Sequence, residues 1–155
     1  MTTEIKPIHP FPARMAPEIA LDHLSKLSPG STVLDPMMGS GTSIKYSTYY
    51  GHTAIGFDMD PLAILISSVW NTPVNLKKLQ KKGYDVLEKA KMVEDVTLDW
   101  IDGNAETVNF IDFWFAKNQI KELRKLSYLI YSLKDGKIKN ALSLILSKLI
   151  ITKDR

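Results

Sequence analysis

The chain has 155 residues, a hydrophobic fraction of 45%, a formal net charge of +3 at pH 7 and no cysteine. This composition is that of a globular protein without disulfides, thiolate metal sites or the cysteine nucleophile that attacks carbon-5 of cytosine. Because residues 1–8 carry no apolar signal core and the longest apolar run is too short for a membrane span, we expect a cytoplasmic protein.

The first half of the chain alternates helical and strand patterns. An extended, proline-rich start over residues 1–14 precedes them, and Ser28-Pro29-Gly30 turns the chain after the first helix. The predicted elements are a helix over 15–27, a strand over 32–35, a loop over 36–41, a helix over 42–50, a strand over 53–58 and a helix from 61 to about 70. This order is typical of the opening of a parallel α/β sheet with right-handed connections.

Beyond Pro73 the pattern becomes mainly helical. The predicted elements are a charged helix over 76–92, a strand or irregular stretch over 96–101, an amphipathic helix around 120–131 and a final helix from about 138 to 151. Only two strands are convincing, whereas a complete Rossmann-type domain has about six or seven. The sequence therefore predicts a βαβ part over 1–73 and a helix-rich extension over 74–155.

The two halves of the chain carry net charges of opposite sign. Residues 1–74 contain 4 Lys/Arg and 6 Asp/Glu, whereas residues 75–155 contain 16 and 11. A basic second half is compatible with a polyanionic partner, because lysines along phosphates release counterions. A solvated, lysine-rich helical surface explains the same surplus, and it is the simpler interpretation.

The loop from Pro36 to Gly41 joins a predicted strand to a predicted helix. Asp35 ends the strand, and Gly39 and Gly41 let the backbone approach a ligand without a Cβ atom in the way. The helix that begins at Thr42 directs its free N–H groups toward the loop. We therefore predict a ligand site here, although a plain turn would use the same residue types.

Spacing separates the classes of ligand that such a loop can hold. A P-loop needs Gly-Lys-Ser/Thr, which is absent, and a dinucleotide fingerprint needs a small residue where Ile44 stands. A nucleoside with a charged amino-acid tail remains, because Asp35 would repel a pyrophosphate and attract an ammonium group. Asp58, at the end of the next predicted strand, can accept hydrogen bonds from ribose hydroxyls, and Met59 can lie against an adenine.

Three segments resemble those of DNA methyltransferases that act on adenine N6 or cytosine N4. Asp-Pro-Met-Met-Gly-Ser-Gly-Thr at 35–42 resembles the family's cofactor motif, and Gly-Phe-Asp-Met-Asp-Pro-Leu-Ala at 56–63 resembles its ribose motif. His-Pro-Phe-Pro-Ala-Arg-Met-Ala-Pro at 9–17 is similar to the segment that packs over the methionine end of the cofactor. The resemblance covers roughly residues 8–70 and implies a partial Rossmann-like class I methyltransferase sheet that binds S-adenosylmethionine.

The resemblance also implies a place for each cofactor-binding residue. It puts Phe11, Ala13 and Arg14 near the methionine moiety. It puts the ribose on Asp58 and the adenine on Met59. The residues implied on the amino-acid and sulfonium side are Asp35, Pro36, Gly39, Ser40, Gly41 and Thr42.

Members of the family transfer the methyl group through a second motif, Asp/Asn/Ser-Pro-Pro followed by an aromatic residue. It accepts hydrogen bonds from the target amino group and stacks on the flipped base. No two of the eight prolines are adjacent here, so this motif is absent from residues 1–155 and no catalytic residue is predicted. Three explanations remain open: a truncated or frame-shifted product, one subunit of a split enzyme, and a cofactor-binding remnant with another role.

These observations favour the cofactor-binding part of a DNA methyltransferase, as in restriction–modification systems. The resemblance implies DNA as the partner of the complete enzyme and direct methyl transfer without a metal. Uncovered apolar faces of the two strands and of residues 141–151 predict a complementary catalytic subunit, a homo-oligomer or marginal stability. A non-catalytic S-adenosylmethionine-binding subunit is the second interpretation, and an enzyme acting on RNA or protein amino groups is the third.

Three further segments carry weaker patterns. The aromatic run over 110–115 could stack on a base or grip single-stranded DNA, but such density is more typical of a core, and we expect a core. Asp102-Gly103-Asn104 could read an adenine amino group at a third strand, but an ordinary turn is the more usual role of these residues. The lysines between 77 and 82 form a basic helix face, for which solvation is a simpler role than contact with a DNA backbone.

Overall fold

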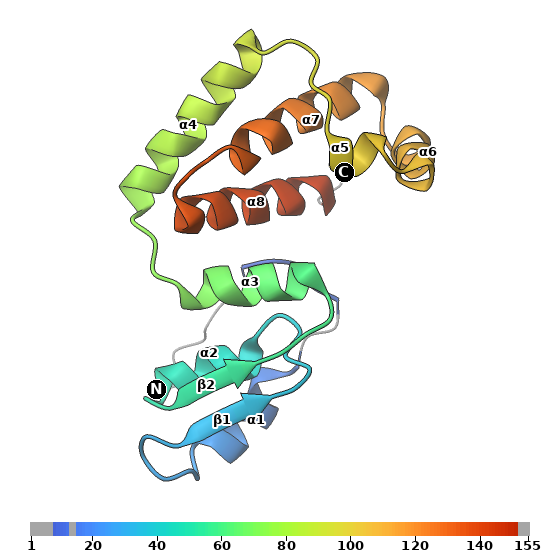
Figure 1. The fold of residues 1–155 in the computed structure, drawn as a ribbon. Coiled ribbons are helices and arrows are strands. Elements are labelled where there is room, and N and C mark those ends of the chain that lie inside the picture. The colour runs from blue at the N-terminus through green and yellow to red at the C-terminus, as the bar shows by residue number, and fades with distance from the viewer. Residues whose placement is uncertain (1–7, 13–14, 152–155) are drawn as a thin grey trace. The chain divides into compact units, whose positions relative to one another are not determined.

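The structure is a computed structural model that describes residues 8–12 and 15–151 (Figure 1). The chain forms two compact units, residues 1–73 and residues 74–155. Each unit has its own packed interior, so each is described by itself. Among the described helices, none is long and apolar enough to cross a membrane.

The first unit contains helices and a parallel sheet, which has two strands among the described residues. Its elements are α1 (Pro17–Leu24), β1 (Thr32–Asp35), α2 (Thr42–Tyr49), β2 (Thr53–Gly56) and α3 (Pro61–Asn71). Thr32 lies opposite Thr53, and Asp35 lies opposite Gly56. Parallel neighbours need a crossover, which α2 provides, so both strands end at the same edge of the sheet.

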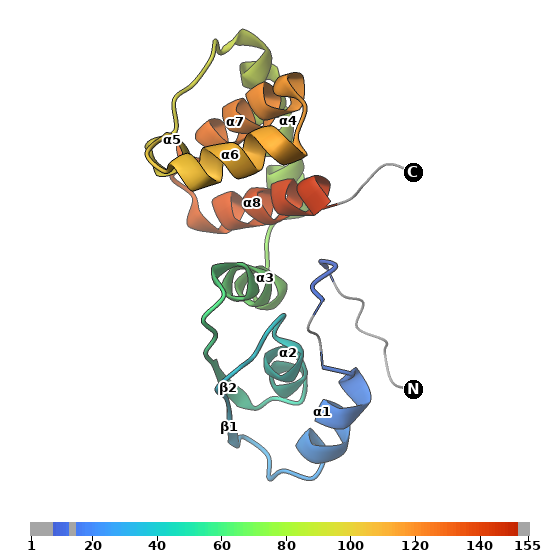
Figure 2. The ribbon, with the colours of Figure 1, turned by 90° about the vertical axis from the view of Figure 1, so that its right-hand side faces the viewer.

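The two faces of this sheet have different surroundings. Val33 packs against a buried cluster that includes Leu24 of α1 and Tyr46 of α2. Both helices lie on the same side of the strands (Figure 2). On the opposite face, Leu34 and Ile55 are 61% and 45% exposed. Because successive side chains of a strand point to opposite faces, one face is packed and the other is an apolar surface open to solvent.

The second unit is helical throughout its described part. Its elements are α4 (Leu76–Met92), α5 (Asp99–Asp102), α6 (Ala105–Trp114), α7 (Lys117–Tyr131) and α8 (Gly136–Ile151). Its core of Val86, Ile130, Ile138 and Leu142 joins α4, α7 and α8, and α5 and α6 lie on the connection between α4 and α7 (Figure 1).

The structure changes the ends of several predicted elements and defines one that was left open. The helix predicted over 15–27 occupies Pro17–Leu24, and the strand predicted over 53–58 ends at Gly56. Residues 96–101, predicted as a strand or an irregular stretch, run irregularly to the buried Leu98 and then enter α5. The reason is local, because the Asp102 carboxylate accepts a 2.7 Å hydrogen bond from the Leu98 N–H and closes a helical turn.

The expectation that the aromatic run over 110–115 forms a core is wrong for most of its rings. Phe110, Phe113 and Trp114 are 59%, 79% and 59% exposed. They belong to α6, whose inward-facing Ile111 lines an apolar cavity together with Phe115, the residue just after the helix. Helical geometry separates these two faces, so the remaining aromatic side chains cluster on the outside of the unit.

Candidate functional site

The loop between β1 and α2 is organised by the carboxylate that ends β1. Asp35 Oδ1 accepts a 3.0 Å hydrogen bond from the Met37 N–H, which turns the chain directly after the strand. Asp35 Oδ2 accepts a hydrogen bond from the Ser43 hydroxyl in the first turn of α2. A single side chain therefore fixes both ends of the glycine loop, residues 36–41.

Glycine is required at two positions of the glycine loop. Gly39 and Gly41 have φ values of +52° and +81°, a left-handed conformation that other residues adopt at a cost. A Cβ atom on Gly41 would lie 2.3 Å from Ser67 Oγ and 2.7 Å from Ser67 Cβ. Gly41 is the N-cap of α2, and Ser67 lies in α3, so the missing side chain lets the two helices approach each other.

Asp58, just beyond β2, ties the second strand to the glycine loop. Its Oδ2 accepts a 2.8 Å hydrogen bond from the Gly39 N–H, and its Oδ1 accepts one of 2.8 Å from the Asp60 N–H. Backbone bonds continue the connection, since the Met38 N–H donates to the Phe57 carbonyl and the Phe57 N–H donates to the Asp35 carbonyl, each at 2.9 Å. The tips of both strands thus belong to one hydrogen-bonded network.

The electrostatics of this network favour an ionised Asp58. The N–H groups of Asp60 and Gly39 lower the pKa of the Asp58 carboxyl below its usual range, because they stabilise the charged form. The carboxylate is half-buried, and Met59 beside it is fully exposed. A carboxylate that accepts one N–H at each oxygen retains lone pairs for further donors.

The structure places the predicted site residues in different surroundings. Asp35, Gly39, Gly41 and Asp58 share the edge where both strands end. Phe11 is half-buried in a short turn, in which its N–H donates to the His9 carbonyl. Pro36 lies in the first turn of the glycine loop. Ala13 and Arg14 lie outside the described residues.

Ser40 and Thr42 are turned into the protein. They are 3% and 2% exposed, and within residues 8–12 and 15–151 neither hydroxyl has a hydrogen-bond partner. A buried hydroxyl without a partner is unfavourable, and water or a ligand group usually satisfies it. As they stand, the hydroxyls of these two residues point into the protein and not toward the solvent side of the glycine loop.

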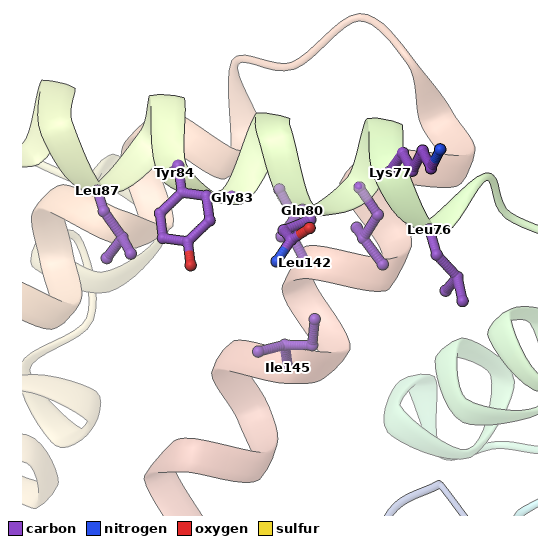
Figure 3. A pocket seen from close by; sticks show the side chains of 9 residues that line it. Leu76, Lys77, Gln80, Gly83, Tyr84, Leu87, Leu142 and Ile145 are labelled. Carbon is purple, nitrogen blue, oxygen red and sulfur yellow. The ribbon is translucent and has the colours of Figure 1, made fainter.

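The second unit contains cavities that the sequence did not predict. A groove of about 560 Å³ lies between α4 and α8 and is lined mainly by apolar side chains, including Leu76, Tyr84 and Ile145 (Figure 3). None of the predicted site residues lines it. Its only sequence signal was the amphipathic pattern of the two helices, which predicts packing and says nothing of a ligand.

Asp102 has a structural role in the second unit. Arg124 of α7 donates to both of its carboxylate oxygens, at 2.9 Å and 2.6 Å. This pairing, together with the Leu98 N–H, lowers the pKa of Asp102, and the same pair raises the pKa of Arg124. The residue ends α5 and not a third strand. With both oxygens engaged, the carboxylate anchors α5 to α7.

No group of His, Asp and Glu side chains suited to a metal ion occurs in the part of the chain that the structure describes. The side chains at the strand edge are instead two carboxylates surrounded by backbone N–H donors. Such a set can accept hydrogen bonds from hydroxyl groups and attract a cationic ligand.

Two known proteins share sequence with this chain. It is 32% identical over 125 residues to the type II methyltransferase M.MvaI of Kocuria varians, an alignment that covers 75% of this chain and 27% of the relative. It is 32% identical over 91 residues to the type II methyltransferase M.MjaII of Methanocaldococcus jannaschii, covering 58% and 17%. The chain therefore spans about a quarter or less of the length of these curated relatives. No family model and no solved structure matches it. The two similarities support a methyltransferase-related function.

Proposed function

We propose that this chain is the S-adenosylmethionine-binding part of a DNA methyltransferase that acts on adenine N6 or cytosine N4, as in restriction–modification systems. The observation that carries the proposal is the bond between Asp58 and Gly39, which joins the acidic tip of β2 to the glycine loop after β1. The similarity to two type II methyltransferases supports the same chemistry.

The residues of the strand edge fit this cofactor chemically. The Asp58 carboxylate has lone pairs for the ribose hydroxyls, and the exposed Met59 side chain provides an apolar surface for adenine. The negative charge of Asp35 favours the methionine ammonium and the sulfonium. Gly41 serves this site indirectly, because its missing side chain lets α3 pack against the start of α2 and so fixes the end of the glycine loop.

When bound, S-adenosylmethionine supplies a methyl group made electrophilic by its sulfonium. The residues of this chain bind and orient it at the edge where both strands end. We propose direct transfer to an amino nitrogen, as the resemblance implies; residues 1–155 themselves contain no cysteine. The groups that hold the target base belong to the Pro-Pro motif, which residues 1–155 do not contain.

The open apolar face of the sheet supports completion by further protein. Leu34 and Ile55 are exposed side by side, because their residues are paired across β1 and β2. Exposed apolar surface on a sheet favours association with another element. We propose that the catalytic part covers this face, either as a complementary subunit or as more of the same protein.

A non-catalytic S-adenosylmethionine-binding subunit is a second candidate function. The observation that favours it is the absence of adjacent prolines from these 155 residues. Both candidates require cofactor binding, so calorimetric titration of the folded chain with S-adenosylmethionine tests them together. Methyl transfer to DNA after addition of a fragment that carries the Pro-Pro-aromatic motif separates them, because only the first candidate predicts it.

A further inference from the structure

A second hollow of the helical unit has the composition of a ligand site. It has a volume of about 450 Å³, within the range of about 300–1,000 Å³ that is typical of ligand pockets. It lies where α5, α7 and α8 meet. The residues that line it are Trp100, Ser127, Ile130, Tyr131, Lys139, Ser143, Leu146, Ser147 and Ile150.

Two aromatic rings form one wall of this hollow. The rings of Trp100 and Tyr131 lie 4.9 Å apart between centroids and are tilted by 41°. Both residues are more than half exposed, at 53% and 61%, although the helices that carry them belong to the packed unit. Aromatic rings open to solvent beside a cavity offer a stacking surface for another planar ring.

A cation is held at the same wall. Lys139 Nζ lies 3.9 Å from the centroid of the Tyr131 ring and donates a 2.8 Å hydrogen bond to the Tyr131 carbonyl. Of the side chains that line the hollow in the described part of the chain, Lys139 is the only charged one. An anion that enters the hollow therefore meets one fixed positive charge and no lining carboxylate.

Hydroxyl groups supply polar contacts in this hollow. Ser127 of α7 and Ser143 of α8 are half-buried, and the structure of residues 8–12 and 15–151 shows no hydrogen bond from either hydroxyl. Each can donate and accept. A planar ring with polar edges, attached to an anion, matches the aromatic wall, the hydroxyls and the lysine together.

We propose that this hollow, the Trp100 pocket, binds an unpaired nucleotide of a nucleic acid strand, with its base against Trp100 and Tyr131 and a phosphate near Lys139. The inference rests on the proposed function for its choice of DNA as the strand. It goes beyond that function, because the Trp100 pocket lies in the helical unit and shares no residue with the strand edge.

Two other surfaces of the same unit fit a nucleotide less well. The groove between α4 and α8 has a single tyrosine ring and no pair of aromatic rings (Figure 3). The outer aromatic side chains of α6 share their helix with Glu106 and Asp112, whose charges repel phosphate. The Trp100 pocket combines two neighbouring aromatic rings with a cation held against one of them, whereas the groove has one ring beside Lys77 and α6 carries acidic side chains beside its rings.

Fluorescence of Trp100 tests the proposal directly in the full chain. A variant with Trp70→Phe and Trp114→Phe leaves Trp100 as the one remaining tryptophan. We titrate it with a single-stranded oligodeoxythymidylate of about eight nucleotides, a length that one binding module can hold. Stacking predicts saturable quenching of Trp100, and an abasic oligomer of equal length should quench much less. Unchanged Trp100 emission, or equal quenching by the abasic oligomer, would overturn the assignment.

Matched variants separate the contributions of the Tyr131 ring and the Lys139 charge to oligonucleotide binding. Tyr131→Ala should weaken oligonucleotide binding on the order of ten-fold, whereas Tyr131→Phe, which keeps the ring, should bind within about two-fold of the parent. Lys139→Ala should make the dependence of affinity on salt shallower, because one phosphate contact is lost. Lys137→Ala is its control, since Lys137 lies on the same helix and does not line the pocket. Equal effects of the two lysine substitutions would contradict the assigned phosphate contact.

The experiments distinguish a failure of cofactor binding from a failure of nucleotide binding. S-Adenosylmethionine binding with no response of Trp100 to oligonucleotide leaves the proposed function intact and removes the Trp100 pocket. Quenching of Trp100 without cofactor binding retains the pocket and removes the proposed function. Quenching by an apolar helical peptide, and by no oligonucleotide, would mark the hollow as a protein-docking site and overturn the proposal.

Discussion

The carboxylate of Asp58 and the amide of Gly39 form a 2.8 Å hydrogen bond between the end of β2 and the loop that follows β1. The two residues are 19 positions apart in the chain. This bond holds the glycine loop against the tip of β2, so that a single ligand can contact both. The proposed cofactor site depends on this relationship.

A side chain at position 41 should destabilise the fold. The loss of unfolding free energy should be larger than for the same substitution at a comparable glycine. Gly30 provides the matched control, because it has a similar φ of +76° and an added Cβ would meet nothing within 4 Å. We expect Gly30→Ala to lower the free energy of unfolding by about 1–2 kcal/mol through backbone strain alone. Gly41→Ala adds the overlap with Ser67 and should cost roughly 1–3 kcal/mol more. Urea unfolding of the two variants measures the difference, and equal losses would contradict the packing of α2 against α3.

The open face of the sheet should control self-association. Replacing Leu34 and Ile55 with threonine places a β-branched residue, which strands favour, at both positions and removes apolar surface that is already exposed. We expect less oligomer in sedimentation experiments and little change in the free energy of unfolding. Val33→Thr, on the packed face, is the control and should destabilise the fold. If the double threonine variant is instead strongly destabilised, the face is covered in the isolated chain.

The ion pair between Arg124 and Asp102 should make the free energy of unfolding depend on pH in the acid range. The pKa of Asp102 is lowered in the folded state, so its contribution is fully present above the ordinary value of 3.8 and is lost as the pH falls through the lowered pKa. Arg124→Gln removes the main cause of the shift, and the loss of unfolding free energy below about pH 4 should become shallower. Lys121→Gln is the control, because its ion pair with Asp95 is exposed. Denaturant unfolding at several pH values measures these slopes, and parallel slopes in wild type and Arg124→Gln would refute the account.

Much of the first unit could be predicted from sequence because its signals are local. Short apolar strands, the turn at Ser28-Pro29-Gly30 and the glycines of the loop each act within a few residues, and β1 and α2 begin at the predicted positions. The parallel pairing of the strands followed from their order and the helix between them. What the residues could not reveal was the bond from Asp58 to Gly39, since it depends on how the strand tips meet.

The second unit was less predictable because its contacts are long-range. Apolar periodicity predicted α4, α7 and α8, but α6 has polar and aromatic residues around its circumference, and its outward rings were assigned to a core. The Trp100 pocket brings together residues from α5, α7 and α8 that no motif connects. Its rings and hydroxyls are individually common, so only their arrangement indicates a site.

We propose that the two strand tips form one site for a sulfonium nucleoside, and a calorimetric thermodynamic cycle measures whether they do. S-Adenosylmethionine and its 2′-deoxy analogue are titrated into the wild type and Asp58→Ala, with Asp60→Asn as a control that retains a good cap for α3. We expect the wild type to bind the cofactor and to bind the deoxy analogue roughly ten-fold more weakly. Asp58→Ala should bind more weakly and no longer distinguish the two ligands. A folded wild type that fails to bind, or an equal preference for the hydroxyl in both proteins, would contradict the account.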